Sequence, residues 1–236
     1  MPDAAKSELR STLRAKRAAV PADERPLLAH NAADQASRLL NPFNRIALYY
    51  ATEEELGTEA LAESLWRDGK SVYLPVINNN RKLRFRLWTP DTQLTLSRLN
   101  TWEPTPSGPD LLAEELDAVI VPLVGFDRNG ARLGMGGGFY DSTLSPALTD
   151  PIMRADKDTK DTKDTKDTKD TKDTKDTKDT KDTKDTKISL NFKPLKIGFA
   201  FDIQEVEHIP TEAHDIALDY VVTPTRIIDC TAANKY

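Results

Sequence analysis

Six short segments rich in apolar, β-branched and aromatic residues constrain the fold of this chain more than any other feature. Segments whose apolar residues recur at the spacing of a helix precede the first of them and lie in two of the intervals between them. Strands that alternate with helices usually pair in parallel and are covered by those helices. We therefore predict an α/β fold in which helices flank a largely parallel central sheet. The predicted strands are residues 45–50, 71–76, 83–88, 117–122, 196–201 and 220–222.

Four segments are typical of helices. The third is expected to begin at Thr58 as its N-cap and to end before Gly69. The first carries basic side chains about one helical turn apart, which form a stripe on one face. This stripe consists of Lys6, Arg10, Arg14 and Arg17. The predicted helices are residues 6–19, about 23–40, 58–68 and 138 to about 148.

Ten copies of Asp-Thr-Lys fill residues 158–187. The repeat has no apolar side chain, so nothing in it can offset the conformational entropy lost on folding. We predict a single domain over residues 1–236, with residues 156–187 as a disordered, low-complexity insertion. A long insertion costs little, because loop-closure entropy grows only with the logarithm of loop length. We interpret the repeat as a neutral expansion, and a functional tether or interaction tail is the alternative.

Charge and cysteine content exclude several functional classes. The repeat is electrically neutral, so the formal charge of −5 belongs to the rest of the chain and disfavours nucleic acid as a partner. Cys230 is the only cysteine, which excludes an intrachain disulfide. No segment resembles a signal-peptide core or reaches the roughly 18 apolar residues of a membrane span. We expect a cytoplasmic monomer that binds neither membrane nor nucleic acid.

Residues 132–141, RLGMGGGFYD, contain four of the ten glycines of the chain. They follow Asn129-Gly130, a hairpin signal, and precede a predicted helix. Glycine lets the backbone approach a ligand, and free N–H groups at the start of a helix attract anions. Arg132 suits phosphate oxygens, and Asp141 could hold a magnesium ion shared with phosphates. The alternative is a tight exit from the hairpin in which Asp141 only favours the helix start.

Other catalytic and nucleotide-binding motifs are missing from the sequence. The segment fits neither the P-loop pattern, which needs Gly-Lys-Ser/Thr, nor the dinucleotide pattern G-x-G-x-x-G, because Phe139 stands at the last glycine. The three histidines lack metal-ligand spacing, and no G-x-S-x-G nucleophile motif is present. A phosphate-containing ligand therefore remains the best interpretation of the glycine-rich segment.

The segment 132–141, taken with residues 121–127, closely resembles the signature of the 5-formyltetrahydrofolate cyclo-ligase family, also called methenyltetrahydrofolate synthetases. The bacterial members are the most similar. The likeness extends over nearly the whole chain outside the repeat, through residues 6–10, 55–58, 102–104 and 214–219. It implies a Rossmann-like cyclo-ligase fold.

The resemblance also implies a reaction. The formyl oxygen of 5-formyltetrahydrofolate attacks the γ-phosphate of ATP, and the neighbouring anilino nitrogen then closes the ring. The products are 5,10-methenyltetrahydrofolate, ADP and phosphate, and magnesium is required. Phosphoryl transfer asks the protein mainly for positioning and charge neutralisation.

The resemblance and the residue types together indicate four sets of site residues. The catalytic set is Arg132, Tyr140 and Asp141. The ATP-binding set is Lys6, Arg10, Arg14, Arg132, Leu133, Gly134, Met135, Gly136, Gly137, Gly138, Phe139 and Tyr140. The folate-binding set is Glu55, Trp102 and Tyr140, because a carboxylate accepts hydrogen bonds from pterin N–H groups and aromatic rings stack on it. The magnesium ligands are Asp141 and Asp215.

One position departs from the family pattern. Many members have lysine where this chain has Gly137, so a phosphate-side charge is lost, and Arg132, Arg10 and Arg14 are the candidates to replace it. An alternative function is a non-catalytic folate- or nucleotide-binding module. A third reading is a sugar-phosphate or coenzyme A enzyme on a similar sheet, which would leave Glu55 and the basic helix unexplained.

Overall fold

A computed structural model describes residues 2–78, 81–98, 100–145 and 194–232, with side chains from residue 5 onward. The predicted insertion at 156–187 and the end of the predicted helix 138–148 lie outside the described residues. Within the described ranges no helix is both long and apolar enough to cross a membrane.

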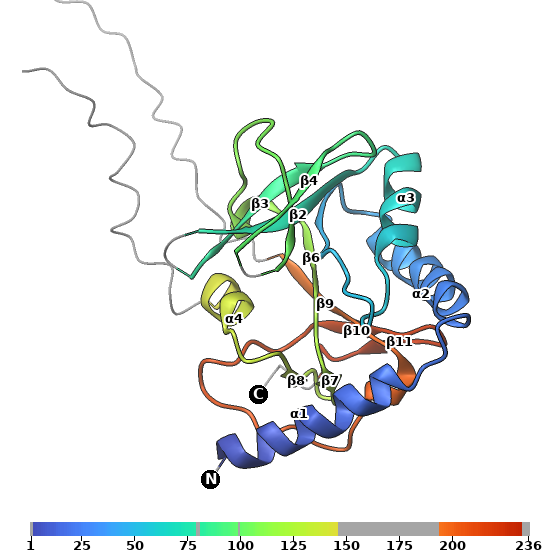
Figure 1. Cartoon of the computed structure of the whole chain (residues 1–236), viewed down its shortest axis with the longest axis vertical. Helices are drawn as coiled ribbons and strands as arrows, with labels where there is room; N and C mark the ends of the chain where they lie inside the picture. The colour runs from blue at the N-terminus through green and yellow to red at the C-terminus, as the bar shows by residue number, and fades with distance from the viewer. Residues whose placement is uncertain (1, 79–80, 99, 146–193, 233–236) are drawn as a thin grey trace, which may run out of the picture. The chain divides into compact units, whose positions relative to one another are not determined.

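Seven strands form the central sheet, in the order β11-β10-β9-β6-β1-β2-β3. The five inner strands pair in parallel, and the two edge strands β3 and β11 pair antiparallel to their neighbours. The predicted α/β fold with a largely parallel sheet is therefore confirmed (Figure 1). The strands are β1 (Arg45–Ala47), β2 (Ser71–Ile77), β3 (Leu83–Trp88), β6 (Ala118–Val121), β9 (Leu195–Phe199), β10 (Tyr220–Val222) and β11 (Ile227–Asp229).

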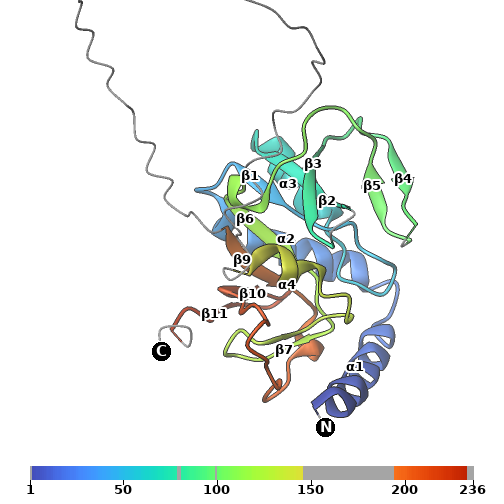
Figure 2. The ribbon, with the colours of Figure 1, turned by 90° about the vertical axis from the view of Figure 1, so that its left-hand side faces the viewer.

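Helices cover the sheet because successive residues of each strand point to opposite faces. Ile46 packs in the cluster that contains the buried residues of α2 (Arg25–Leu40) and α3 (Glu59–Arg67). Ala47, the next residue, belongs to the cluster on the opposite face, next to α4 (Phe139–Leu144) and the short helix η1 (Ala113–Glu115). Figures 1 and 2 show α2 and α3 on one side of the sheet and α4 on the other.

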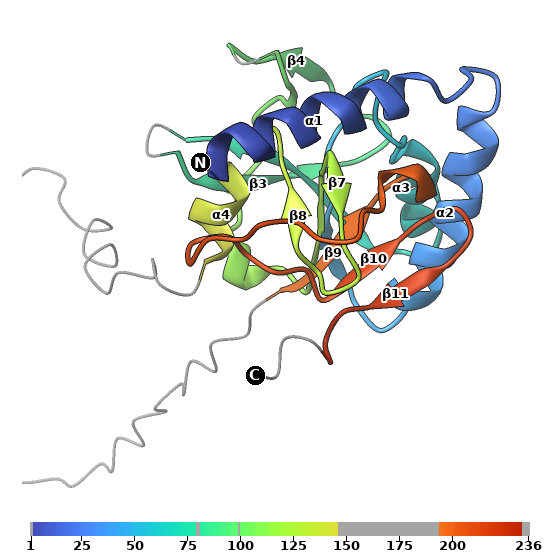
Figure 3. The same cartoon turned by 90° about the horizontal axis from the view of Figure 1, so that it is seen from below.

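The first helix, α1 (Pro2–Ala18), packs on a hairpin rather than on the sheet. The hairpin consists of β7 (Gly125–Phe126) and β8 (Arg132–Leu133), and α1 lies across it in Figure 3. Leu13 is fully buried there. A Cβ at Gly125 would lie 2.3 Å from Leu13 Cδ1 and 3.3 Å from the Gln204 carbonyl oxygen, so only glycine permits this approach. This packing fixes the basic stripe of α1 relative to the glycine-rich segment.

Some local details differ from the sequence-based predictions. Thr58 stands at the N-cap position of α3, but its hydroxyl donates to the Tyr49 carbonyl at 2.5 Å instead of capping the helix. Gly69 ends that helix with a φ of +72°, as predicted. The predicted strand 45–50 stops at Ala47, and the Leu48 N–H makes one more hydrogen bond, to the Tyr73 carbonyl of β2. The elements that were not predicted are β4 (Leu94–Leu96), β5 (Trp102–Pro104), β11, η1 and η4 (Asp202–Gln204).

Candidate active site

A large cleft opens where the parallel strands end. Its volume is about 1420 Å³, and its walls include the carboxyl end of β2 and residues that follow β1 and β6. Other parts of the walls come from α1, the start of α2, the loop that precedes α4, the β4–β5 hairpin and residues 212–215. Ligands of open α/β sheets bind at the carboxyl ends of the strands, so this cleft is the expected position of an active site.

All the residues predicted from the sequence to bind ATP, folate or magnesium line this one cleft. Segments near both ends of the chain and from its middle are thus brought together. Many other residues that line the cleft were not predicted to bind a ligand, among them Arg17, Tyr50, Glu54 and Thr101. The basic stripe of the first helix pointed to Arg17, whereas nothing in the sequence pointed to the other three.

The glycine-rich segment presents bare backbone to the cleft. Gly136 and Gly138 have φ values of +94° and +66°, which side chains rarely tolerate. A Cβ at either position would meet no atom within 4 Å, so open space borders the backbone. Arg10 Nε donates to the Gly134 carbonyl at 2.8 Å and ties α1 to this segment. Helix α4 begins within this segment, at Phe139.

Arg132 and Asp141 form a close ion pair beside the glycines. Arg132 Nη2 donates to Asp141 Oδ1 at 2.6 Å, and their side chains are 5% and 17% exposed. The backbone N–H of Ile216 donates to the same oxygen at 3.1 Å. Arg132 Nε is buried without a hydrogen-bond partner among the described residues. The Arg132 guanidinium is therefore fixed at the cleft and still has an unused N–H donor. Asp141 is held in place by two donors, Arg132 and the Ile216 N–H.

A second pair joins the beginning of the chain to its end. Lys6 Nζ lies 3.0 Å from both Asp215 Oδ2 and Glu212 Oε1. Burial alone would lower the pKa of Lys6, but the hydrogen bonds that it donates to Asp215 and Glu212 raise it above the usual value. Burial opposes ionisation of Asp215 as well, yet the Glu212 N–H and Lys6 lower its pKa. Both groups are therefore charged at neutral pH.

This pair gives a testable pH dependence. The lowered pKa of Asp215 adds stability above its usual value of 3.8, which is lost as pH falls through the lower folded value. The raised pKa of Lys6 adds stability below 10.5, which is lost only as pH rises beyond that value. We expect Lys6→Met to cost about 1 kcal/mol of unfolding free energy at neutral pH. The difference from wild type, measured by urea unfolding, should shrink as the pH falls below 3.8, and a difference that stays constant would contradict this account.

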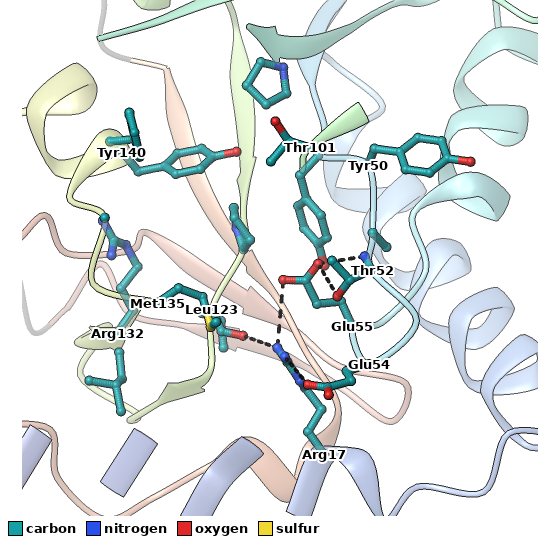
Figure 4. Close-up of a pocket in the computed structure, with 18 of the residues that line it drawn as sticks. Arg17, Tyr50, Thr52, Glu54, Glu55, Thr101, Leu123, Arg132, Met135 and Tyr140 are labelled. Atoms are coloured by element: carbon teal, nitrogen blue, oxygen red, sulfur yellow. Dashed lines mark hydrogen bonds and ion pairs between the residues drawn. The ribbon is translucent and has the colours of Figure 1, made fainter. Parts of the chain in front are cut away.

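Glu55 lies on the opposite wall, in the loop after β1 (Figure 4). Its Oε2 accepts hydrogen bonds from the Thr52 N–H at 2.9 Å and the Thr52 hydroxyl at 3.1 Å. Its Oε1 lies 3.9 Å from Arg17 Nη1, and within the described part of the chain it accepts no hydrogen bond. One oxygen of this carboxylate is thus anchored, and the other is available to a donor on a ligand.

Tyr140 extends from the start of α4 into the cleft (Figure 4). Burial raises the pKa of its hydroxyl well above the usual value, the charge of Glu55 raises it further, and Arg132 lowers it. Tyr140 is therefore neutral at physiological pH and can donate a hydrogen bond.

Aromatic rings form a row from the core to the rim of the cleft. Trp66 packs edge-on against Trp88 at 4.9 Å between ring centroids, and Trp88 contacts Tyr50 at 6.1 Å. Tyr50 contacts Trp102 at 6.3 Å, and Trp102 is 45% exposed. Trp102 is thus supported by Tyr50 while nearly half of its surface is exposed, which suits contact with a flat ligand.

The predicted magnesium ligands, Asp141 and Asp215, both line the cleft but each is paired with a cation. Among the described residues no group of three or more histidine, cysteine or carboxylate side chains could hold a metal alone. Magnesium bound with a nucleotide needs only one or two carboxylates, because phosphate oxygens and water complete its shell. Asp141 Oδ2 accepts no hydrogen bond from the described residues. The donor set therefore fits a magnesium ion that arrives with phosphates.

The sequence profile of the 5-formyltetrahydrofolate cyclo-ligase family matches residues 2–158. The chain belongs to this family. The 5-formyltetrahydrofolate cyclo-ligase of Escherichia coli K12 is 34% identical over 185 residues, which cover 77% of this chain and 79% of that protein. The cyclo-ligase of Haemophilus influenzae is 38% identical over 176 residues, covering 73% and 72%. The sequence-based assignment to the cyclo-ligase family is thus confirmed.

Solved structures of similar proteins support the same fold. The NMR structure of Aquifex aeolicus 5,10-methenyltetrahydrofolate synthetase has a TM-score of 0.68 at 24% identity, covering 95% of this chain and 92% of that one. The Mycoplasma pneumoniae 5,10-methenyltetrahydrofolate synthetase has a TM-score of 0.58 at 19% identity, covering 93% and 98%. The cyclo-ligase sheet is therefore shared despite low sequence identity.

Proposed function

We propose that this cyclo-ligase family member converts 5-formyltetrahydrofolate to 5,10-methenyltetrahydrofolate. ATP is used as its complex with Mg²⁺, and ADP and phosphate are released. The formyl oxygen attacks the γ-phosphorus, and the bond to ADP breaks. The anilino nitrogen then forms a bond to the formyl carbon, loses its proton, and phosphate leaves with the former formyl oxygen. The observation that carries this proposal is the convergence of a bare glycine backbone, buried arginine and a half-satisfied carboxylate in one cleft of the family's fold.

The nucleotide lies on the side of the cleft formed by α1 and the glycine-rich segment. At Gly136, Gly137 and Gly138 no side chain covers the backbone, so the N–H groups of this segment can approach the phosphates. Arg132 and Arg10 are fixed beside them by the contacts with Asp141 and the Gly134 carbonyl. These cations compensate for the lysine that many relatives have at Gly137. The other members of the proposed ATP-binding set are Lys6, Arg14, Leu133, Met135, Phe139 and Tyr140.

Asp141 and Asp215 would hold the magnesium ion together with the phosphate oxygens. When bound, that ion would neutralise phosphate charge. The residues of the chain supply position: Arg132 orients Asp141, and Lys6 orients Asp215. Because both carboxylates are held by cations before any ligand binds, little reorganisation is needed when MgATP arrives.

The folate lies on the opposite wall. Oε1 of Glu55 accepts hydrogen bonds from the pterin, since it is the unoccupied oxygen of an anchored carboxylate. Trp102 stacks on one flat face of the substrate. Tyr140, which stays protonated, donates a hydrogen bond at the reacting formyl group between the two substrates.

A direct assay tests the proposal. Purified protein is mixed with 5-formyltetrahydrofolate and MgATP, and the absorbance of the methenyl product is followed together with ADP release. We expect one ADP for each methenyl product, and no product when ATP or magnesium is omitted. Folate binding without product would instead support the non-catalytic module that the glycine at position 137 suggests.

Deletion of residues 158–187 tests the interpretation of the repeat. All the proposed site residues lie outside it, and it contains no apolar side chain. We expect kcat and both KM values to stay within about twofold of wild type, because a surface insertion changes loop closure only weakly. A much lower kcat in a deletion variant with an unchanged Tm would show that the repeat takes part in function. We also propose that the protein is a cytoplasmic monomer. Analytical sedimentation of the wild type and of the deletion variant would measure the oligomeric state.

A further inference from the structure

Arg17, in the last turn of α1, is the most buried cation among the described residues, with an exposed fraction of 2%. It lies at the floor of the cleft and reaches toward the opposite wall (Figure 4). A buried guanidinium is costly, because its desolvation is repaid only by well-placed partners. Its contacts therefore need a reason beyond packing.

The guanidinium joins two segments that border the cleft. Nη1 donates to the Leu123 carbonyl at 3.4 Å and lies 3.9 Å from Glu55 Oε1. Nη2 donates to Glu54 Oε2 at 3.3 Å. Nε is buried and has no partner among the described residues. An unpaired buried donor is destabilising, so this arrangement is poorly explained as a device for stability alone.

The effect of Arg17 falls on Glu55. Thr52 holds one oxygen of that carboxylate. With only this oxygen anchored, the carboxylate can still rotate and move its second oxygen. Arg17 attracts Oε1 from 3.9 Å, which is too far for a hydrogen bond, so the acceptor sites of Oε1 stay available. The charge of Arg17 thus sets the direction of the oxygen without occupying it.

We propose that Arg17 is a positioning residue that aims Glu55 Oε1 at the N–H groups of the pterin. This inference rests on the proposed function, since it assigns a role within the same site. Direct phosphate binding by Arg17 is the competing role. It is disfavoured because the side chain is 3% exposed and has Glu54 and Glu55 beside it, which repel an anion.

The test compares Arg17→Gln with Lys196→Gln. Lys196 is also a mostly buried cation, 17% exposed and paired with Asp219, but it lies at the opposite end of the strands, outside the cleft. We expect Arg17→Gln to raise KM for 5-formyltetrahydrofolate about tenfold, with KM for ATP changed less than about twofold. Lys196→Gln should change neither constant. A rise in KM for ATP alone, or equal changes in both, would overturn the proposal.

A double-mutant cycle with Glu55→Gln separates positioning from general damage. If Arg17 acts through Glu55, adding Arg17→Gln to Glu55→Gln raises the folate KM by less than about twofold. Independent, multiplicative effects would overturn the inference. If Arg17→Gln does not fold, Arg17→Lys takes its place, because lysine keeps the charge but lacks the planar fork. We then expect a folate KM about threefold higher than wild type, and no such rise in the Glu55→Gln background.

Failure of the proposed function has a different signature. If wild-type protein gives no methenyl product, the dissociation constant for 5-formyltetrahydrofolate replaces KM in the same cycle. Non-additive losses of affinity would still support the role of Arg17. Unchanged affinity in Arg17→Gln would overturn it.

Discussion

Replacing Asp141 with alanine is expected to lower kcat/KM for both substrates about 10²–10³-fold. The carboxylate accepts hydrogen bonds from Arg132 at 2.6 Å and from the Ile216 N–H at 3.1 Å, so its loss releases both. Arg132 is only 5% exposed, and a buried cation without its partner costs about 3–5 kcal/mol of stability. The phosphates thus lose a fixed cation and a magnesium ligand in one substitution. Arg132→Ala should have a similar effect on turnover.

Two further variants separate chemistry from stability. Asp141→Asn keeps an acceptor oxygen for both donors but removes the negative charge, so we expect a smaller loss of Tm than in Asp141→Ala, with most of the activity still lost. Asp219→Asn removes an equally ion-paired aspartate outside the cleft and should retain activity within about twofold. Steady-state kinetics and thermal unfolding measure the two effects separately. Substantial turnover by Asp141→Asn would remove Asp141 from the proposed metal and phosphate site.

Replacing Glu55 with alanine is expected to raise KM for 5-formyltetrahydrofolate about 10–100-fold, the loss that follows removal of a charged hydrogen-bond acceptor. Thr52 remains to shape the loop, so the fold should persist. KM for ATP should change little, because the nucleotide is proposed to bind the opposite wall.

Glu53→Ala is a matched control for that substitution. Glu53 lies two residues earlier in the same loop and its side chain is exposed. Its backbone carbonyl accepts a hydrogen bond from Arg25 at 2.9 Å, which alanine would preserve. We expect wild-type kinetics from this variant. A folate KM that rises equally in both variants would mean that general loop charge, rather than the Glu55 carboxylate, controls binding.

Elements with a strong local pattern could be predicted from the sequence. The alternation in Leu83–Trp88 gave the bounds of β3 correctly, and the continuous apolar run after Asp117 gave β6. The three-residue strands β4, β5 and β11 have no such signal. They exist because a neighbouring strand offers backbone hydrogen bonds, which is a tertiary effect.

In the candidate site, too, local features could be predicted from the sequence, whereas contacts between distant segments could not. The glycine-rich segment is local, so its residues and their place before a helix could be predicted. The pairing of Lys6 with Asp215 could not, because these residues are 209 positions apart and were assigned to nucleotide and metal separately. Arg17 was visible only as one member of a basic stripe. Its burial depends on the loop at Glu54, which no periodicity links to α1.

The contact between Lys6 and Asp215 has a consequence for biosynthesis. A nascent chain that has just released its glycine-rich segment from the ribosome still lacks Asp215 and the strands around it, so catalytic competence can arise only after these later residues have been synthesised. Cutting the polypeptide within residues 158–187 would likewise distribute the two carboxylates, Asp141 and Asp215, between separate fragments. Neither fragment would turn over alone, and recovery of activity on mixing them would report their reassembly.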